Sequence, residues 1–155
     1  MALIRNLFQW NFILMTAITG WLVAQVLKTG INAALSRQLH IERMWGDGGM
    51  PSAHSATVCA MLVATARLTG TNSPVFAVAS VVAIITMHDA MGVRRETGEQ
   101  AKVLNRIINE WMDLGARNAP ILADKNLKEM VGHTPIEVIS GAVVGALIGM
   151  FMPMM

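Results

Sequence analysis

Residues 75–91 read VFAVASVVAIITMHDAM and are almost free of polar side chains until His88 and Asp89. An apolar run of this length favours a helix that crosses a lipid bilayer. Three other stretches have the same character, at about 12–35, 53–68 and 135–152. Some of these stretches are short for the roughly 20 residues that a crossing needs, so we expect tilt or local thinning of the membrane.

The composition of the chain supports a membrane location. Of the 155 residues, 54% are hydrophobic and only 14% are charged, whereas about a quarter of the residues in a soluble domain are charged. An unusually apolar soluble helical bundle is the alternative. We predict an all-α integral membrane helical bundle, with about four transmembrane spans plus shorter amphipathic helices. Residues 1–155 are expected to form a single membrane-embedded domain, with one amphipathic helix at about 100–114.

The charge and the cysteine content exclude several classes of function. A formal net charge of +2 is too small to indicate a nucleic-acid partner, and no stripe of basic and aromatic residues supports one. The single cysteine, Cys59, cannot form an internal disulfide and has no partner cysteines for a structural zinc site. It lies among Ala, Val and Met, so we expect a packing role.

Lysines and arginines are concentrated in two polar segments, 36–50 and 92–132. With four spans, both segments lie on one side of the membrane, and the other side keeps Arg5 and Arg67. Cytoplasmic loops of membrane proteins carry an excess of lysine and arginine. We therefore expect an integral membrane protein of a bacterial inner membrane or its equivalent, with both polar segments in the cytoplasm.

Gly141, Gly145 and Gly149 recur every four residues in the last apolar stretch. Small residues at this spacing let another helix approach closely within a membrane. The partner helix is either part of the same chain or part of a second copy, which would make these glycines the seam of a homodimer. The sequence leaves both alternatives open.

Three places hold polar residues that a membrane span normally avoids. The first is GGMPSAHS at 48–55, in which flexible glycines, including Gly49, lead to Ser52. Ser52 is a good N-cap, and the free amides at a helix start form an anion site. His54 lies in the first turn of the expected helix, directed at whatever those amides hold. Ordinary capping with an incidental histidine is the alternative.

The second place is GHTPIE at 132–137. His133 and Glu137 are four residues apart and share a face if the segment is helical. A carboxylate bonded to one imidazole nitrogen would leave the other nitrogen as a nucleophile. The segment also forms a capping box, with Thr134 as N-cap and the Glu137 side chain returning to the cap backbone. Both roles cannot be fully satisfied at once, and taken alone the capping box is favoured.

The third place follows the apolar run directly, as HDAMGVRRE at 88–96. Arg94 and Arg95 are the kind of side chain that binds phosphate oxygens in a fork, although adjacent arginines at the end of a span also snorkel to the membrane surface. Asp89, near the end of an apolar helix, needs a partner, which one of these arginines can supply. Lys28, embedded in the first stretch, raises the same question.

All these polar groups fall at the ends of spans on one side of the membrane. Two histidines, several cations and two helix N-termini would then face a common pocket. In-line phosphoryl transfer requires a nucleophile, an acid for the leaving oxygen and positive charge for the other phosphate oxygens. We therefore interpret the polar groups as one phosphate site.

At these residues the chain resembles the superfamily of type-2 phosphatidic acid phosphatases and vanadium haloperoxidases, and more closely its short, divergent bacterial and plastid branch. The superfamily's Pro-Ser-Gly-His motif is matched by PSAH at 51–54, and its His-x-x-x-Asp motif by His133 to Glu137. The branch's own signatures correspond to GGMPSAHS, DAMGVRR and GHTPIEV in this chain. Together these motifs span most of the chain.

The resemblance implies a metal-independent lipid phosphatase without a cofactor. It implies that His133 attacks phosphorus and forms a phosphohistidine, that Glu137 orients His133, and that His54 protonates the leaving alkoxide. The other implied residues bind the substrate phosphate (Lys28, Ser52, Arg94, Arg95) or support the site (Gly49, Asp89). The expected substrate is a lipid phosphate among membrane lipids, such as phosphatidylglycerol phosphate, phosphatidic acid or an isoprenyl diphosphate.

The chain departs from the superfamily pattern at several points, and one of them is the absence of the usual arginine-proline of the first motif. Ala53 replaces the motif glycine, and Glu137 replaces the aspartate. The arginine pair lies far upstream of His133, whereas in the superfamily the last arginine lies a few residues before the nucleophile.

Two alternatives come from other classes of function. One is a metal-dependent phospholipid head-group enzyme, such as a transferase, that uses Asp89, Glu96 and Glu99. The other is a non-catalytic membrane protein whose pocket only binds anionic lipid. The first predicts that a chelator abolishes activity, and the second predicts lipid binding without release of phosphate.

Overall fold

The structure, a computed structural model, describes residues 11–36, 49–113, 127–129 and 131–154. Within these ranges the regular secondary structure is entirely helical, with no strand, so the all-α prediction is confirmed for this part of the chain. The helices are α2 (Phe12–Ser36), α3 (Ala53–Thr69), α4 (Pro74–Met91), α5 (Val93–Asp113) and α6 (Pro135–Phe151). Arg5, named in the charge distribution, and Gly48, the first residue of GGMPSAHS, lie outside the described residues.

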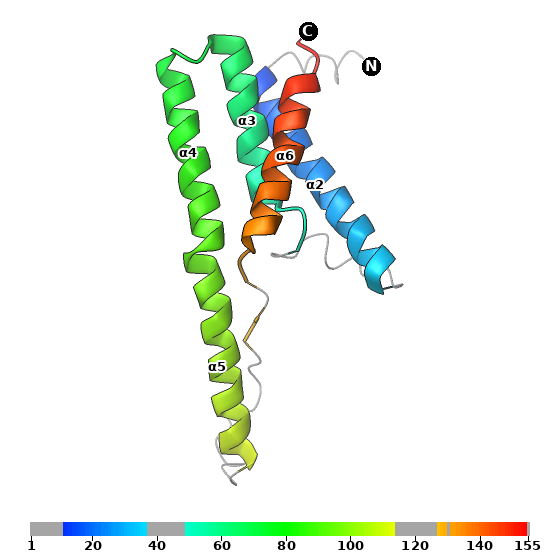
Figure 1. Ribbon diagram of the computed structural model, residues 1–155, viewed down its shortest axis with the longest axis vertical. Coiled ribbons are helices and arrows are strands. Elements are labelled where there is room, and N and C mark those ends of the chain that lie inside the picture. Colours follow the sequence, from blue (N-terminus) through cyan, green and yellow to red (C-terminus); the bar gives the residue numbers. More distant parts are fainter. Residues whose placement is uncertain (1–10, 37–48, 114–126, 130, 155) are drawn as a thin grey trace.

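Local signals set the ends of the apolar helices. Ser73 caps α4 and Thr134 caps α6, and in each case a proline follows at the start of the helix, where its missing N–H is not needed. Gly70, with φ of 79°, follows the last residue of α3. The amphipathic helix differs from the prediction. α5 begins at Val93 rather than near residue 100, and only Gly92 separates it from α4 (Figure 1).

Two described segments are long and apolar enough to cross a membrane: Phe12–Ala34 and Pro74–Trp111, the second of which joins α4 to α5. Pro135–Phe151 is a shorter apolar helix, and α3 also has only 17 residues. At the usual rise, such a helix is about 26 Å long, somewhat less than the roughly 30 Å of the hydrocarbon core. Helix length and composition therefore support two crossings, and the four predicted spans are not confirmed.

α3 is the central helix of the bundle and contacts α2, α4 and α6 (Figure 1). α2, α3, α4 and α6 alternate in direction, so the end of α2, the start of α3, the end of α4 and the start of α6 lie toward one end of the bundle. α5 extends beyond that end, and the last turn of α6 lies at the opposite end. The polar motifs of the sequence are therefore gathered at one end of the molecule.

The interior of the bundle is built from small side chains. Ala24, Ala53 and Ala56 form a buried cluster, with Trp21 packed against it, and the largest fully buried side chains are threonines and serines. Large apolar side chains are exposed instead, as on α4: Val75, Val78, Val81, Val82, Ile84 and Ile85. Soluble domains bury such residues, whereas membrane helices pack through small ones. The distribution supports a lipid environment.

Gly141, Gly145 and Gly149 form the face of α6 that contacts α3. A Cβ atom at Gly141 or Gly145 would overlap the carbonyl oxygen of Ser52 or Ala56, and one at Gly149 would lie 2.7 Å from a side-chain carbon of α3. All three glycines are buried. The intramolecular alternative is therefore realised, and a homodimer through the same glycines stays a prediction.

The end of the bundle away from the polar motifs is fastened by Arg67, in the last turn of α3. Its Nη1 donates to the carbonyl oxygens of Gly149 (2.6 Å) and Met152 (2.8 Å), near the C-terminus of α6. Its guanidinium carbon lies 5.5 Å from the centroid of the Phe12 ring at the start of α2. Arg67 thereby connects three helices at this end.

Candidate active site

The N-termini of α3 and α6 lie side by side. Ser52 caps α3, and its Oγ accepts from the Ser55 backbone N–H (3.3 Å) and from the Ser55 hydroxyl (3.1 Å). The Ser52 backbone N–H donates to the carbonyl oxygen of Glu137 in the first turn of α6 (2.9 Å). Because the two helix starts adjoin, their free amides are directed at the same end of the bundle, which favours a bound anion.

The two histidines of the sequence motifs meet at these helix starts. The backbone N–H of His133 donates to the carbonyl oxygen of Ala90, near the end of α4 (3.0 Å). His133 is 3% exposed, and His54 is half-buried. The two ring centroids are 6.0 Å apart, and the ring planes make an angle of 82°. His54 and His133 therefore belong to one site.

Lys28 reaches this site from α2. It is 6% exposed, and its aliphatic stem lies against Gly49, where a Cβ atom would be 3.6 Å from Cγ of Lys28. Gly49 has φ of 88°, a conformation that L side chains rarely adopt. The loop that leads to Ser52 therefore lies against the aliphatic part of the Lys28 side chain.

The arginine pair is brought close to His133 by Gly132. A Cβ atom at Gly132 would overlap the backbone of Arg95, and the φ of Gly132 is +86°. Close contact and backbone conformation both require glycine here. The pair is distant from His133 in the sequence, but its backbone lies against the residue immediately before His133. The fold therefore brings the backbone of the arginine pair beside the residue that precedes His133, and phosphate binding by either arginine stays a prediction.

The segment before His133 is fastened along α5. Asn105 Nδ2 donates to the carbonyl oxygen of Leu127 (2.9 Å) and to Oε1 of Glu129 (2.8 Å), while Asn105 Oδ1 accepts from the Leu127 N–H (3.0 Å). Gly98 permits the close approach, since a Cβ atom there would lie 2.7 Å from the carbonyl oxygens of Glu129 and Val131. α5 therefore supports the segment that carries His133.

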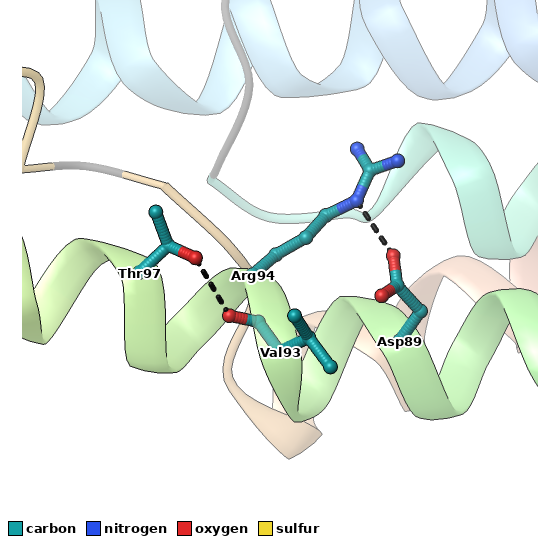
Figure 2. Close-up of polar contacts among 4 residues, drawn as sticks. All are labelled: Asp89, Val93, Arg94 and Thr97. Atoms are coloured by element: carbon teal, nitrogen blue, oxygen red, sulfur yellow. Dashed lines mark hydrogen bonds and ion pairs between the residues drawn. The ribbon is translucent and has the colours of Figure 1, made fainter.

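Asp89 and Arg94 form an ion pair across the junction of α4 and α5 (Figure 2). Nε of Arg94 lies 2.8 Å from Oδ2 of Asp89, which confirms that Asp89 pairs with one of the arginines. The side chains are 47% and 39% exposed for Arg94 and Asp89, so the pair stabilises the fold by at most about 1 kcal/mol. Figure 2 shows the two Nη atoms of Arg94 directed away from Asp89.

Glu137 takes part in the capping box of α6. Its backbone N–H donates to Oγ1 of Thr134 (3.4 Å), and its Oε2 accepts from the Thr134 N–H (2.9 Å). This is the role that the sequence favoured for Glu137 taken alone. The capping box engages Oε2 of Glu137. Orientation of His133 by Glu137 would therefore depend on Oε1, and it stays a prediction.

The acidic residues that the metal-dependent alternative would use as ligands have other surroundings in the structure. Asp89 pairs with Arg94, Glu99 lies 2.9 Å from the ammonium of Lys102, and Glu96 is exposed. Among the described residues, no group of three or more His, Cys, Asp or Glu side chains could hold a metal ion. That alternative therefore has no ligand set in this part of the chain.

Sequence reasoning missed one buried polar residue near the site. Gln25 of α2 is 8% exposed, and its Oε1 has no hydrogen-bond partner within the described ranges. It lies three residues before Lys28, about one helical turn away. The signal that could have found it is a second polar side chain within an apolar span, near the lysine.

Comparison with known proteins identifies the family. The model of a family described as "Divergent PAP2 family" matches residues 9–148. The uncharacterized membrane protein YuiD of Bacillus subtilis (strain 168) is 41% identical over 145 residues, which cover 89% of this chain and 91% of that protein. No solved structure matches the chain. Because this relative is a membrane protein, it supports the predicted membrane location. The family match covers nearly the whole length of this chain, so the chain belongs to the divergent PAP2 family.

Proposed function

We propose that this protein is a membrane phosphatase that hydrolyses a phosphomonoester or diphosphate of a lipid through a phosphohistidine intermediate. One observation carries the proposal: the rings of His54 and His133 lie 6.0 Å apart at the adjoining N-termini of α3 and α6. A histidine nucleophile and a histidine acid need such proximity to act on one phosphate group. Membership of the divergent PAP2 family supports the same chemistry.

The reaction has two steps. A ring nitrogen of His133 attacks phosphorus, and the bond from phosphorus to the leaving oxygen breaks as His54 donates a proton to that oxygen. Water then attacks the phosphohistidine while His54 accepts a proton from it. The phosphorus–nitrogen bond breaks, inorganic phosphate leaves, and both histidines return to their starting states. The reaction balances with water as the only co-substrate.

The phosphate oxygens are bound by donors that adjoin the two histidines. The free amides at the start of α3 and the Ser52 hydroxyl supply hydrogen bonds, and the ammonium of Lys28 supplies charge. Arg94 is the preferred arginine of the pair, since its Nη atoms are directed away from Asp89 (Figure 2). Fixed donors of this kind stabilise the charge that develops in the transition state, each by about 3–4 kcal/mol in comparable sites.

A lipid substrate fits the surface of the bundle. Large apolar side chains on the outside of α4 and α6 contact the acyl region, and the site lies at the end of the bundle, where lipid head groups are found. In this proposal α2, α3, α4 and α6 all cross the membrane, the two short helices by local thinning. α5 then extends into the cytoplasm, the side that the concentration of lysine and arginine favours.

The candidate substrates are phosphatidylglycerol phosphate, phosphatidic acid and isoprenyl diphosphates. The test is release of inorganic phosphate from these lipids by detergent-purified protein in excess chelator. The wild type should release phosphate, and His133→Ala should lower the rate by about 1000-fold or more, because the nucleophile is removed. His54→Ala should lower the rate by about 100- to 10,000-fold, because the leaving oxygen loses its acid.

His88→Ala is the matched control, because His88 is an exposed histidine of α4 that the mechanism does not use. It should keep the wild-type rate within about twofold. Activity that disappears from the wild type in chelator would support the metal-dependent head-group enzyme instead. Lipid binding without phosphate release, unchanged in His133→Ala, would support the non-catalytic lipid-binding protein.

A further inference from the structure

Gln25 is a buried polar residue that the proposed reaction does not use. The residue is 8% exposed, and its Oε1 is buried and has no hydrogen-bond partner in the part of the chain that the structure describes. A buried carbonyl oxygen without a partner destabilises a fold, and more so in a membrane bundle, where water is scarce. Such a group indicates a donor that arrives with a ligand.

Gln25 lies on the part of α2 that packs near the start of α3. Its neighbour Ala24 packs against Ala53, the residue before His54 in the first turn of α3. Lys28 lies about one turn further along α2, beside the loop that leads into α3. α2 also contacts α6. From these neighbours we infer that Gln25 lies near the level of the start of α3, about one turn deeper in the bundle than Lys28.

We propose that Gln25 accepts a hydrogen bond from a hydroxyl group on the alcohol that carries the phosphate. The inference rests on the proposed function and specifies its substrate class: a lipid whose polar head group has a free hydroxyl beside the phosphate ester. A carbonyl oxygen only accepts hydrogen bonds, and a phosphate monoester is largely ionised at neutral pH. The donor therefore belongs to the alcohol rather than to the phosphate.

The depth of Gln25 agrees with this assignment. Lys28 and the amides at the start of α3 bind the phosphate at the end of the bundle, and the esterified alcohol connects the phosphate to a lipid in the membrane. An acceptor one turn deeper than Lys28 meets the alcohol before the acyl chains begin. A site built to bind a hydroxyl discriminates strongly against an analogue that lacks it, because the acceptor is then left unpaired.

The test compares two substrates that differ in one hydroxyl group. The probes are phosphatidylglycerol phosphate and an analogue in which hydrogen replaces the glycerol hydroxyl next to the phosphate. For the detergent-purified full chain, kcat/KM for phosphate release should be about 10- to 100-fold higher with the hydroxylated lipid. Gln25→Met keeps the length of the side chain and removes the acceptor. It should lower kcat/KM for the hydroxylated lipid to the value for the analogue, which itself changes less than about twofold.

Lys28→Met is the matched control, since the same side chain replaces a residue one turn away on the same helix. It should lower kcat/KM for both substrates by the same factor, because the phosphate is common to both. Equal kcat/KM values for the two substrates in the wild type would overturn the inference without any variant. A loss in Gln25→Met that is equal for both substrates would also overturn it.

Thermal unfolding of the ligand-free proteins separates a substrate contact from a structural role. Gln25→Met should unfold at or above the wild-type temperature, because it removes a buried acceptor that lacks a partner. Unfolding of Gln25→Met at a much lower temperature would assign Gln25 to the fold and overturn the inference. If the wild type releases no phosphate from any lipid of the panel, the proposed function itself fails and the inference fails with it. Hydrolysis without preference for the hydroxyl leaves the proposed function standing.

Discussion

The contact between α3 and α6 determines how closely His54 and His133 approach, and Gly145→Ala perturbs it directly. Gly145 is buried in the middle of α6, and a Cβ atom there would overlap the carbonyl oxygen of Ala56. The obstacle is backbone, so no side-chain rotation relieves the overlap, and α6 must move away from α3.

The magnitude follows from two opposing effects. Overpacking of this kind costs about 1–3 kcal/mol, while replacing a helical glycine by alanine returns about 0.5–1 kcal/mol. Gly30→Ala is the matched control, because Gly30 lies within α2 and a Cβ atom there would meet nothing within 4 Å. It gains the same helix propensity without the overlap. The difference between the two variants therefore isolates the steric cost.

The assay is thermal unfolding of both variants in detergent. For a chain of 155 residues, 1 kcal/mol changes Tm by about 2–4 °C. Gly145→Ala should therefore unfold roughly 2–12 °C below Gly30→Ala, and Gly30→Ala should unfold at or slightly above the wild type. Phosphate release by Gly145→Ala should also decrease, since α6 follows His133 directly. Equal unfolding temperatures for the two variants would refute the close packing of α6 on α3.

Three further predictions concern the support of the site. Asn105→Ala removes the bonds that fasten Leu127 and Glu129 to α5, so limited proteolysis near these residues should be faster and phosphate release about 10-fold lower; unchanged cleavage would contradict this support. Arg67→Met removes two charge-assisted bonds to α6 at the distant end, so Tm should fall by about 3–12 °C while kcat/KM changes less than twofold. Lost activity at unchanged Tm would argue against that role. Asp89→Asn breaks an exposed ion pair worth about 0–1 kcal/mol, so Tm should change by only a few degrees and activity should persist in chelator. Complete loss of activity would favour Asp89 as a metal ligand.

The helix boundaries could be predicted because their signals are local. The apolar runs define the helices, and Ser73 and Thr134, each followed by proline, mark where two of them begin. The start of α5 could not be predicted in this way. Its first turns are polar, and they pack against Glu129, Val131 and Gly132, which lie far away in the sequence. A helix supported by such a contact carries little signal in its own residues.

The candidate site was predictable as a set of motifs but not as an arrangement. PSAH and GHTPIE each indicate a histidine at a helix start, and with four spans the sequence predicts that both starts lie on one side of the membrane. It does not show that Gly132 lies against Arg95, because a glycine is compatible with many close contacts. Gln25 was missed for a related reason: a single amide within an apolar span becomes informative only when its burial and its missing partner are known.

The most direct test of the central claim is identification of the residue that carries phosphate during turnover. Purified protein is mixed with a lipid labelled in its phosphate, quenched within the first turnover, and examined for protein-bound label. Label is expected on His133, where it is lost in acid and retained in alkali, and no label is expected in His133→Ala. Steady phosphate release without bound label at any time, or label on a residue other than His133, would contradict a histidine nucleophile at the start of α6.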